Sequence, residues 1–194
     1  MTWTVPNILT SLRIILIPVL VLVFYFPFHW SYQLSAAVFG LAALTDWLDG
    51  YLARRLGQLS PFGAFLDPVA DKLMVAVALV LLVQDNPTFV FAIPAAIIIG
   101  REIVISALRE WMSELGQRTR VAVSIVGKIK TTMQMIAILM MLYKVPIGPL
   151  PTHTVGAVLL YIAALLTLWS MAVYLRAAWP ILSGKPGVPP VDGA

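Results

Sequence analysis

The chain has 194 residues, of which 60% are hydrophobic and 11% charged, with a mean hydropathy of +0.92 and a net charge of +4. A soluble domain carries about 25% charged residues, so this composition excludes an ordinary soluble protein and indicates an integral membrane protein. In such a protein a small positive charge reflects basic cytoplasmic loops, and we expect no nucleic-acid partner. The absence of cysteine excludes disulfides, thiolate catalysis and thiolate metal sites.

Six apolar segments are long enough to cross a bilayer as helices, because a span needs roughly 20 mainly apolar residues. In chain order they cover residues 8–28, 33–55, 66–84, 88–109, 121–143 and 153–177. Proline-containing breaks mark the ends of three of them, at Pro27, at Asn86-Pro87 and over residues 146–151. The sequence therefore predicts an all-α integral membrane protein, a bundle of six transmembrane helices in a single domain over residues 1–183.

The two ends of the chain carry separate expectations. The apolar run from Ile14 to Phe28 resembles a signal peptide, but no small-residue cleavage site follows it, so we expect a retained span. Residues 184–194 are rich in glycine and proline, which predicts a disordered cytoplasmic tail.

The basic residues are distributed very unevenly between the two sides of the predicted bundle. With the N-terminus in the cytoplasm, Lys144 alone falls on the outer side. The cytoplasmic side then receives Arg13, Arg54, Arg55, Lys72, Arg101, Arg109, Arg118, Arg120, Lys128, Lys130, Arg176 and Lys185. This asymmetry follows the positive-inside rule and predicts a multi-pass protein whose N-terminus faces the cytoplasm.

Four of the nine acidic residues lie between positions 46 and 71, in the pattern D-x-x-D-G-x-x-A-R followed by G-x-x-x-D-x-x-x-D. Residues three or four apart share a helix face, so the pattern predicts two facing stripes. One stripe holds Asp46, Asp49, Gly50 and Ala53, and the other holds Gly63, Asp67 and Asp71. Such a concentration of acids in an apolar chain points to a functional site.

Cations are needed to hold four carboxylates together in a region of low dielectric constant. Too few basic residues lie at the depth of Asp46 and Asp67 for a set of buried ion pairs, so we expect metal ions. Carboxylate oxygens favour Mg²⁺ or Mn²⁺. At about 1.5 Å per residue, Asp46 lies roughly 12 Å below Arg54, near the depth of the lipid headgroups. A lipid phosphate or diphosphate fits this position best.

A second group of candidate residues is basic. Arg101 and Arg109 are eight residues apart and share a helix face, and Lys128 and Lys130 begin the next span on the same side. We expect these four residues to form a phosphate pocket, although a solvated cytoplasmic rim would have the same composition. Three further residues of the first span could border the pocket: Asn7, Thr10 and Arg13. Glu102 is expected to pair with a neighbouring base.

At every specified position the carboxylate pattern resembles the signature of the CDP-alcohol phosphotransferase family. Three further segments, PNILTSLRI from Pro6, GREIVISALREW from Gly100 and GKIKTTMQM from Gly127, are similar to a bacterial branch that uses glycerol 3-phosphate. The resemblance runs from Pro6 to about Arg176. It implies transfer of the phosphatidyl group of CDP-diacylglycerol to sn-glycerol 3-phosphate, giving phosphatidylglycerophosphate and CMP for phosphatidylglycerol synthesis in the bacterial inner membrane.

The resemblance also implies roles for individual residues. It implies two Mg²⁺ or Mn²⁺ ions, a homodimer, and Asp71 as the catalytic base. The implied metal ligands are Asp46, Asp49, Asp67 and Asp71. For CDP-diacylglycerol, Gly50 and Ala53 would leave room for the nucleotide and Arg54 would bind the diphosphate. The full set of expected CDP-diacylglycerol contacts is Asp49, Gly50, Ala53, Arg54 and Gly63, the last by resemblance alone.

Other functions remain open at this level. The same chemistry could use phosphatidylglycerol as acceptor, as in a cardiolipin synthase, or inositol phosphate or serine. The basic pocket favours a phosphorylated acceptor over serine. A divalent-cation transporter would also place acids in a membrane, but its acids would be spread through the midplane of several spans.

Overall fold

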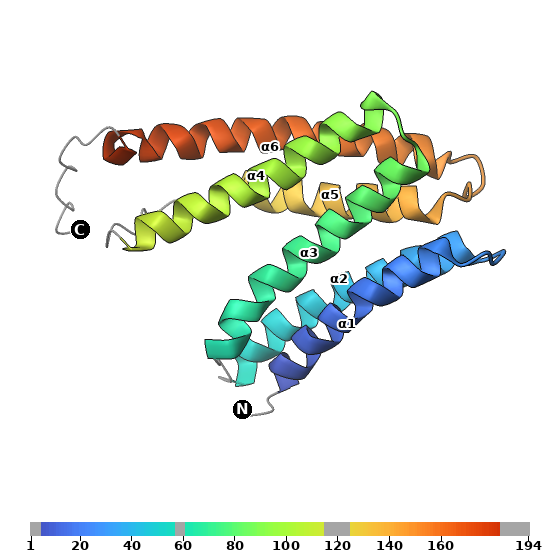
Figure 1. Ribbon diagram of the computed structural model, residues 1–194, viewed down its shortest axis with the longest axis horizontal. Helices are drawn as coiled ribbons and strands as arrows, with labels where there is room; N and C mark the ends of the chain where they lie inside the picture. Colours follow the sequence, from blue (N-terminus) through green and yellow to red (C-terminus); the bar gives the residue numbers. More distant parts are fainter. Residues whose placement is uncertain (1–4, 57–60, 115–124, 183–194) are drawn as a thin grey trace.

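The computed structural model describes residues 5–56, 61–114 and 125–182, which fold into six helices (Figure 1). The helices are α1 (Val5–Tyr25), α2 (Ser31–Leu56), α3 (Pro61–Asp85), α4 (Phe89–Glu114), α5 (Ile125–Tyr143) and α6 (Thr152–Leu182). Each predicted span coincides with one helix, so the predicted all-α class is confirmed.

The helix ends differ from the predicted ones for local reasons. Helix α3 begins at Pro61, five residues earlier than expected, because proline fits the first helical position, where no amide donor is needed. Helices α1, α3 and α4 each contain an interior proline, at positions 18, 68 and 94. Such prolines are tolerated in membrane helices because neighbouring groups compensate for the lost backbone hydrogen bond. The expected tail at 184–194 lies outside the described residues.

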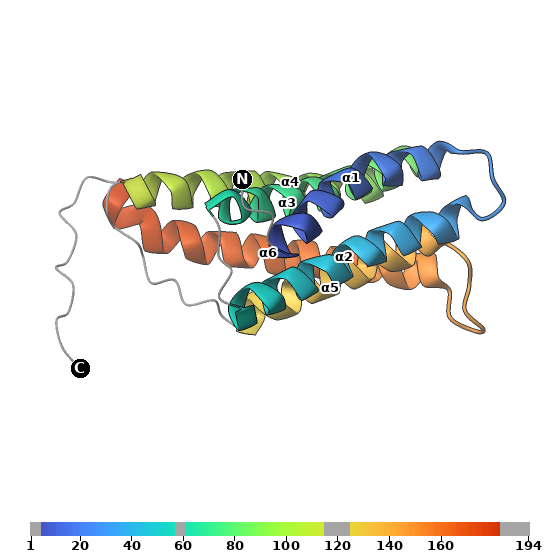
Figure 2. The same ribbon diagram turned by 90° about the horizontal axis from the view of Figure 1, so that it is seen from below.

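The helices run lengthwise, so the α1/α2, α3/α4 and α5/α6 turns gather at one end of the molecule (Figure 1). Helix α1 packs on α2, α5 packs on α6, and α3 contacts α1, α2, α4 and α5. Figure 2 shows α2 lying beside α5, in agreement with their contacts. The C-terminal half of α2 and the N-terminal half of α3 therefore lie next to α1, away from the three turns.

Large apolar side chains lie both inside the bundle and on its surface. Leu20, Phe39, Met74, Ile98 and Ile138, from five different helices, are almost completely buried. Large apolar side chains also point outward, including Leu22, Phe65, Phe89 and Trp169, each more than 60% exposed. Contiguous apolar surface of this kind is matched by lipid rather than by water.

Within the described residues, three helices contain a stretch that is long and apolar enough to cross a membrane: Asn7–Tyr25, Phe89–Met112 and Thr152–Arg176. In α2 and α3 the aspartates and nearby basic residues interrupt the apolar run. The apolar stretch of α5, Ile129–Tyr143, is shorter. Membrane association is therefore supported by three helices, while the crossing of all six stays a prediction.

The end with the three turns is fixed by polar contacts. Lys144, which follows α5, forms a 2.7 Å ion pair with Asp85 at the end of α3, and its Nζ lies 4.3 Å from the centre of the Tyr32 ring. Burial lowers the pKa of Lys144, but the hydrogen bonds to Asp85 and Tyr32 outweigh it and the pKa is raised. Lys144 has a left-handed backbone conformation, with φ 61°, which is common just after the end of a helix.

Candidate active site

The four aspartates of the sequence pattern lie where α2 and α3 meet α1. Asp46 and Asp49 come from the C-terminal half of α2, and Asp67 and Asp71 from the N-terminal half of α3. The side chain of Asp49 is only 4% exposed, whereas those of Asp46 and Asp71 are 49% and 42% exposed. Asp49 is thus buried within the site, while Asp46 and Asp71 are accessible to solvent.

Arg13 of α1 reaches into this group of acids. Its Nη2 bonds to Asp49 and lies 3.3 Å from Asp46, and its Nη1 bonds to Asp71. One guanidinium therefore joins three carboxylates from two helices. The expectation that too few basic residues lie at the depth of Asp46 overlooked α1, which brings Arg13 close from 33 residues away in the sequence.

The fourth aspartate is held by the same face of α1. The hydroxyl of Thr10, one turn before Arg13, donates a hydrogen bond to Asp67, and Asn7 on that face is also buried. Asn7, Thr10 and Arg13 were expected to border the phosphate pocket, and the structure places Thr10 and Arg13 against the aspartates. We call Asp46, Asp49, Asp67 and Asp71, with Thr10 and Arg13, the carboxylate cluster.

The chemistry of this cluster fits a hard divalent cation. Three carboxylates converge on a single positive group, and carboxylate oxygens are the ligands that Mg²⁺ and Mn²⁺ prefer. Within the described ranges, however, no three acidic or histidine side chains are already arranged to hold a metal ion. In this arrangement Asp46, Asp49 and Asp71 contact the guanidinium of Arg13.

The residues expected to contact CDP-diacylglycerol can be placed only in part. Gly50 follows Asp49 on α2 and is partly exposed, and Gly63 is buried near the start of α3. The side chains of Ala53 and Arg54 lie outside the described part of the structure. The described members of the two stripes therefore lie on α2 and α3, while the place of Ala53 in its stripe and the diphosphate contact of Arg54 stay predictions.

A second group of residues, which we call the basic cluster, consists of Arg101 and Arg109 of α4 and Lys130 of α5, with polar neighbours on α6. Arg101 pairs with Glu102 at 2.6 Å, and Lys130 lies 3.9 Å from the same carboxylate. Arg101 and Lys130 are both largely buried, with side chains 11% and 4% exposed, and Arg109 is exposed. Glu102 thus pairs with basic residues, as the sequence predicted. Lys128 lies in the first turns of α5, and its side chain is outside the described part of the structure.

Helix α6 contributes residues to the basic cluster that sequence reasoning missed. The Arg101 and Arg109 guanidinium groups lie 5.8 and 5.4 Å from the centre of the Tyr174 ring, and Arg109 donates a 3.2 Å hydrogen bond to its hydroxyl. Ser170, one turn earlier, accepts a 3.5 Å hydrogen bond from Arg101. Ser170 and Tyr174 are four residues apart and so share a helix face, but only the packing of α6 on α4 brings that face to the arginines.

A further residue, Lys72, links α3, which carries Asp71, to α4, which carries Arg101 and Arg109. It follows Asp71 on α3 and donates a hydrogen bond to Ser106, which lies between Arg101 and Arg109 on α4. Its role as a bridge depends on the packing of α3 against α4, which only the three-dimensional structure gives.

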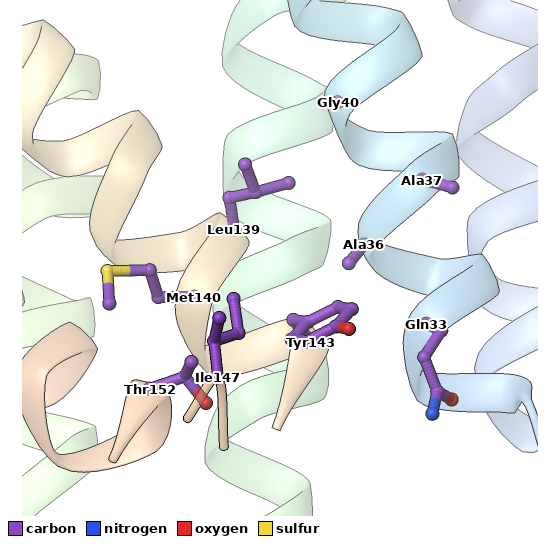
Figure 3. Close-up of a pocket in the computed structure, with 9 residues that line it drawn as sticks. All are labelled: Gln33, Ala36, Ala37, Gly40, Leu139, Met140, Tyr143, Ile147 and Thr152. Carbon is purple, nitrogen blue, oxygen red and sulfur yellow. The ribbon is translucent and has the colours of Figure 1, made fainter. Parts of the chain in front are cut away.

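A cavity of about 410 Å³ lies between α2 and α5, away from the carboxylate cluster (Figure 3). Its lining is almost wholly apolar, and its residues are Gln33, Ala36, Ala37, Gly40, Leu139, Met140, Tyr143, Ile147 and Thr152. It contains no charged group that could hold a diphosphate. The carboxylate and basic clusters are therefore the candidate site for polar chemistry.

Comparison with known proteins agrees with this geometry. A family model described as CDP-alcohol phosphatidyltransferase matches residues 3–169. The chain belongs to the CDP-alcohol phosphatidyltransferase family. This family uses divalent metal ions, in keeping with the donor set of the carboxylate cluster.

Relatives within the CDP-alcohol phosphatidyltransferase family are close. A protein of Pseudomonas fluorescens is 58% identical over 184 residues, covering 92% of this chain and 91% of the relative. Proteins of Salmonella choleraesuis (strain SC-B67) and Shigella flexneri are each 53% identical over 178 residues, covering 92% of this chain and 96% of the relative. All three are named CDP-diacylglycerol–glycerol-3-phosphate 3-phosphatidyltransferase.

Proposed function

We propose that the chain transfers the phosphatidyl group of CDP-diacylglycerol to sn-glycerol 3-phosphate, releasing CMP and forming phosphatidylglycerophosphate. The observation that carries this proposal is the agreement with relatives of that name over 92% of the chain at 53–58% identity. The carboxylate cluster and the basic cluster supply the two kinds of group that the reaction needs, one for a diphosphate donor and one for a phosphorylated acceptor.

Asp46, Asp49, Asp67 and Asp71 would hold the divalent cations, Mg²⁺ or Mn²⁺. When bound, these ions neutralise the charge of the diphosphate and of the departing CMP. Gly50, Ala53, Arg54 and Gly63, on the same two helices, would receive the nucleotide. Small side chains allow the close approach of the nucleotide, and an arginine gives charge-assisted hydrogen bonds to the diphosphate.

Asp71 is the proposed general base. It would accept the proton of the acceptor hydroxyl while that oxygen bonds to the β-phosphorus and the bond to the CMP oxygen breaks. A base must reach the substrate, and the Asp71 side chain is 42% exposed. Asp49, at 4% exposure, is too enclosed for this role.

The basic cluster is the proposed site for the phosphate of the acceptor. Arg101, Arg109, Lys128 and Lys130 would bind it, and Arg109 is the most accessible of the described three. Serine carries no phosphate and so makes no use of such a pocket. Phosphatidylglycerol and inositol phosphate do carry one, and an experiment must separate them from glycerol 3-phosphate.

The proposal also covers the membrane location, topology and oligomeric state of the enzyme. The chain would form a single domain with six transmembrane helices in the bacterial inner membrane, associated as a homodimer, with both clusters on the cytoplasmic side. The support for this orientation is the strong asymmetry of the basic residues.

An acceptor panel tests the function. Purified protein in detergent micelles with CDP-diacylglycerol is offered glycerol 3-phosphate, phosphatidylglycerol, inositol phosphate and serine, and CMP release is measured with Mg²⁺, with Mn²⁺ and with excess EDTA. We expect rapid release with glycerol 3-phosphate and metal, and a loss of at least a hundredfold in EDTA. A clear preference for another acceptor would reject the glycerol 3-phosphate assignment, and full activity in EDTA would reject the metal site.

A further inference from the structure

Arg13 occupies an unusual position for a charged residue. Its side chain is 1% exposed, and it contacts Asp46, Asp49 and Asp71 at once. A buried arginine is stable only where acidic groups neutralise it, and here one positive charge faces three negative ones. Arg13 and these three aspartates together carry a net charge of −2, and Asp67 adds a further negative charge.

The same carboxylate oxygens are the proposed ligands of the divalent cations, so Arg13 and the cations compete for them. Four aspartates carry four negative charges, which two divalent cations balance without any help from Arg13. A guanidinium that stayed in the centre would add a surplus positive charge and keep the oxygens of Asp46, Asp49 and Asp71 occupied.

The carboxylates do not provide a hydrogen-bond partner for every nitrogen of the Arg13 guanidinium. The two terminal nitrogens are bonded, but the buried Nε has no hydrogen-bond partner. Buried donors are normally paired, so an unpaired Nε lowers the free energy needed to move the guanidinium away.

Other basic residues near the cluster are engaged elsewhere. Lys72 donates to Ser106 of α4, and Arg55 donates a 2.8 Å hydrogen bond to Tyr51 and lies 5.7 Å from the centre of its ring. Among the described side chains, Arg13 is thus the cation that pairs with the cluster.

We propose that Arg13 is a built-in counterion, which holds the carboxylate cluster together in the metal-free protein and is displaced from Asp46, Asp49 and Asp71 when divalent cations bind. This inference rests on the metal site of the proposed function. It gives Arg13 a positioning role toward the metal ligands, distinct from the phosphate contact that the sequence suggested.

The test is a titration with Mn²⁺ in the absence of both substrates. The full chain in detergent micelles is compared with Arg13→Gln and Arg13→Lys, and free Mn²⁺ is followed by electron paramagnetic resonance. Arg55→Gln, which removes an exposed arginine outside the cluster, is the matched control. We expect the Kd for Mn²⁺ to fall at least tenfold in Arg13→Gln, less in Arg13→Lys, and to stay within twofold of the parent in Arg55→Gln.

Thermal unfolding in EDTA and in saturating Mn²⁺ provides a second readout. Without Arg13, the acids repel one another until metal arrives, so Arg13→Gln should lose several degrees of Tm in EDTA and recover most of the loss in Mn²⁺. An equal loss in both conditions, or an unchanged or weaker Mn²⁺ affinity, would show a purely structural arginine and overturn the proposal. If Arg13→Gln does not fold, Arg13→Lys decides by the same criteria.

The two proposals can fail separately. If glycerol 3-phosphate is not the preferred acceptor but removal of Arg13 still tightens Mn²⁺ binding, the proposed reaction is rejected and the counterion role of Arg13 is retained. If neither the parent nor Arg13→Gln binds Mn²⁺, the metal site and its displacement of Arg13 are both rejected.

Discussion

The four aspartates share one sequence pattern but have different surroundings. Asp49 is enclosed and paired with Arg13, Asp67 accepts a hydrogen bond from Thr10, and Asp46 and Asp71 reach the surface. Residues that hold metal and a residue that accepts a proton have different requirements, since only the latter must touch the acceptor. Exposure therefore sets the enclosed Asp49 apart from Asp46 and Asp71, which spacing cannot do, while the choice of Asp71 over Asp46 as the base comes from the family resemblance.

Replacing Asp71 by asparagine tests the proposed base. Asparagine keeps the shape and one oxygen ligand but cannot accept the proton, so Asp71→Asn should lower kcat by at least a thousandfold. The Kd for Mn²⁺ should rise by less than tenfold. Asp67→Asn is the matched control, because it removes the same charge from the cluster without removing the base, and it should weaken Mn²⁺ binding more.

CMP release and Mn²⁺ titration on the same preparations give both quantities for Asp71→Asn and Asp67→Asn. Substantial turnover by Asp71→Asn would reject the base assignment. A loss of metal as severe as that of Asp67→Asn would show that Asp71 acts mainly as a ligand.

Sequence reasoning grouped the aspartates correctly because the members of each acidic stripe are close together in the sequence. Residues three or four apart share a helix face whatever the tertiary fold, so two acidic stripes could be predicted. Arg13 and Tyr174 could not be placed in this way, because their contacts join α1 to α2 and α3, and α6 to α4. Such contacts depend on helix packing, which the pattern within one helix does not contain.

At the level of the elements, the helices themselves could be predicted from the sequence because each is a long apolar run between breakers. The way they pack is set by individual side chains. Gly156 of α6 faces α5 so closely that an added Cβ would lie 2.7 Å from Cγ of Met141 and 2.9 Å from the carbonyl oxygen of Ala137. Because α5 and α6 are in extensive contact, this glycine sets their separation.

Replacing Gly156 by alanine should therefore destabilise the bundle. Met141 can shift, but the backbone oxygen of Ala137 cannot without moving α5, so a cost of about 1–3 kcal/mol is expected. Gly100→Ala is the matched control, because a Cβ at Gly100 meets nothing within 4 Å and alanine favours a helix. Thermal unfolding in detergent should give a lower Tm for Gly156→Ala and an unchanged or higher Tm for Gly100→Ala. Equal Tm values would mean that α5 and α6 are not held at this distance.

At the level of the whole molecule, the two ends of the bundle differ in character. The end with the α1/α2, α3/α4 and α5/α6 turns carries the Lys144–Asp85 ion pair (Figure 1). The carboxylate cluster lies nearer the other end, where α2 is followed by α3. If all six helices cross the bilayer, the three turns share one side of the membrane and the two termini share the other.

The number of crossings can be tested because the natural chain has no cysteine. Single cysteines are introduced at exposed positions in two turns, Thr88 and Pro149, and near the C-terminal ends of α4 and α6, at Glu110 and Trp179. With six spans and a cytoplasmic N-terminus, a membrane-impermeant maleimide should label Thr88→Cys and Pro149→Cys in intact spheroplasts. Glu110→Cys and Trp179→Cys should react only after lysis.

The alternative with three spans gives a different labelling pattern. If only α1, α4 and α6 crossed, Thr88 and Glu110 would keep their sides, because α2 and α3 would both stay outside. The α5/α6 turn would then remain inside and α6 would end outside, so the labelling of Pro149→Cys and Trp179→Cys would be exchanged. These two positions therefore decide between three and six crossings, and Thr88 with Glu110 serves as the internal control. Three crossings would also place the α2 and α3 aspartates on the outer side of the membrane. An exchange of labelling would therefore reject the proposed cytoplasmic position of the active site.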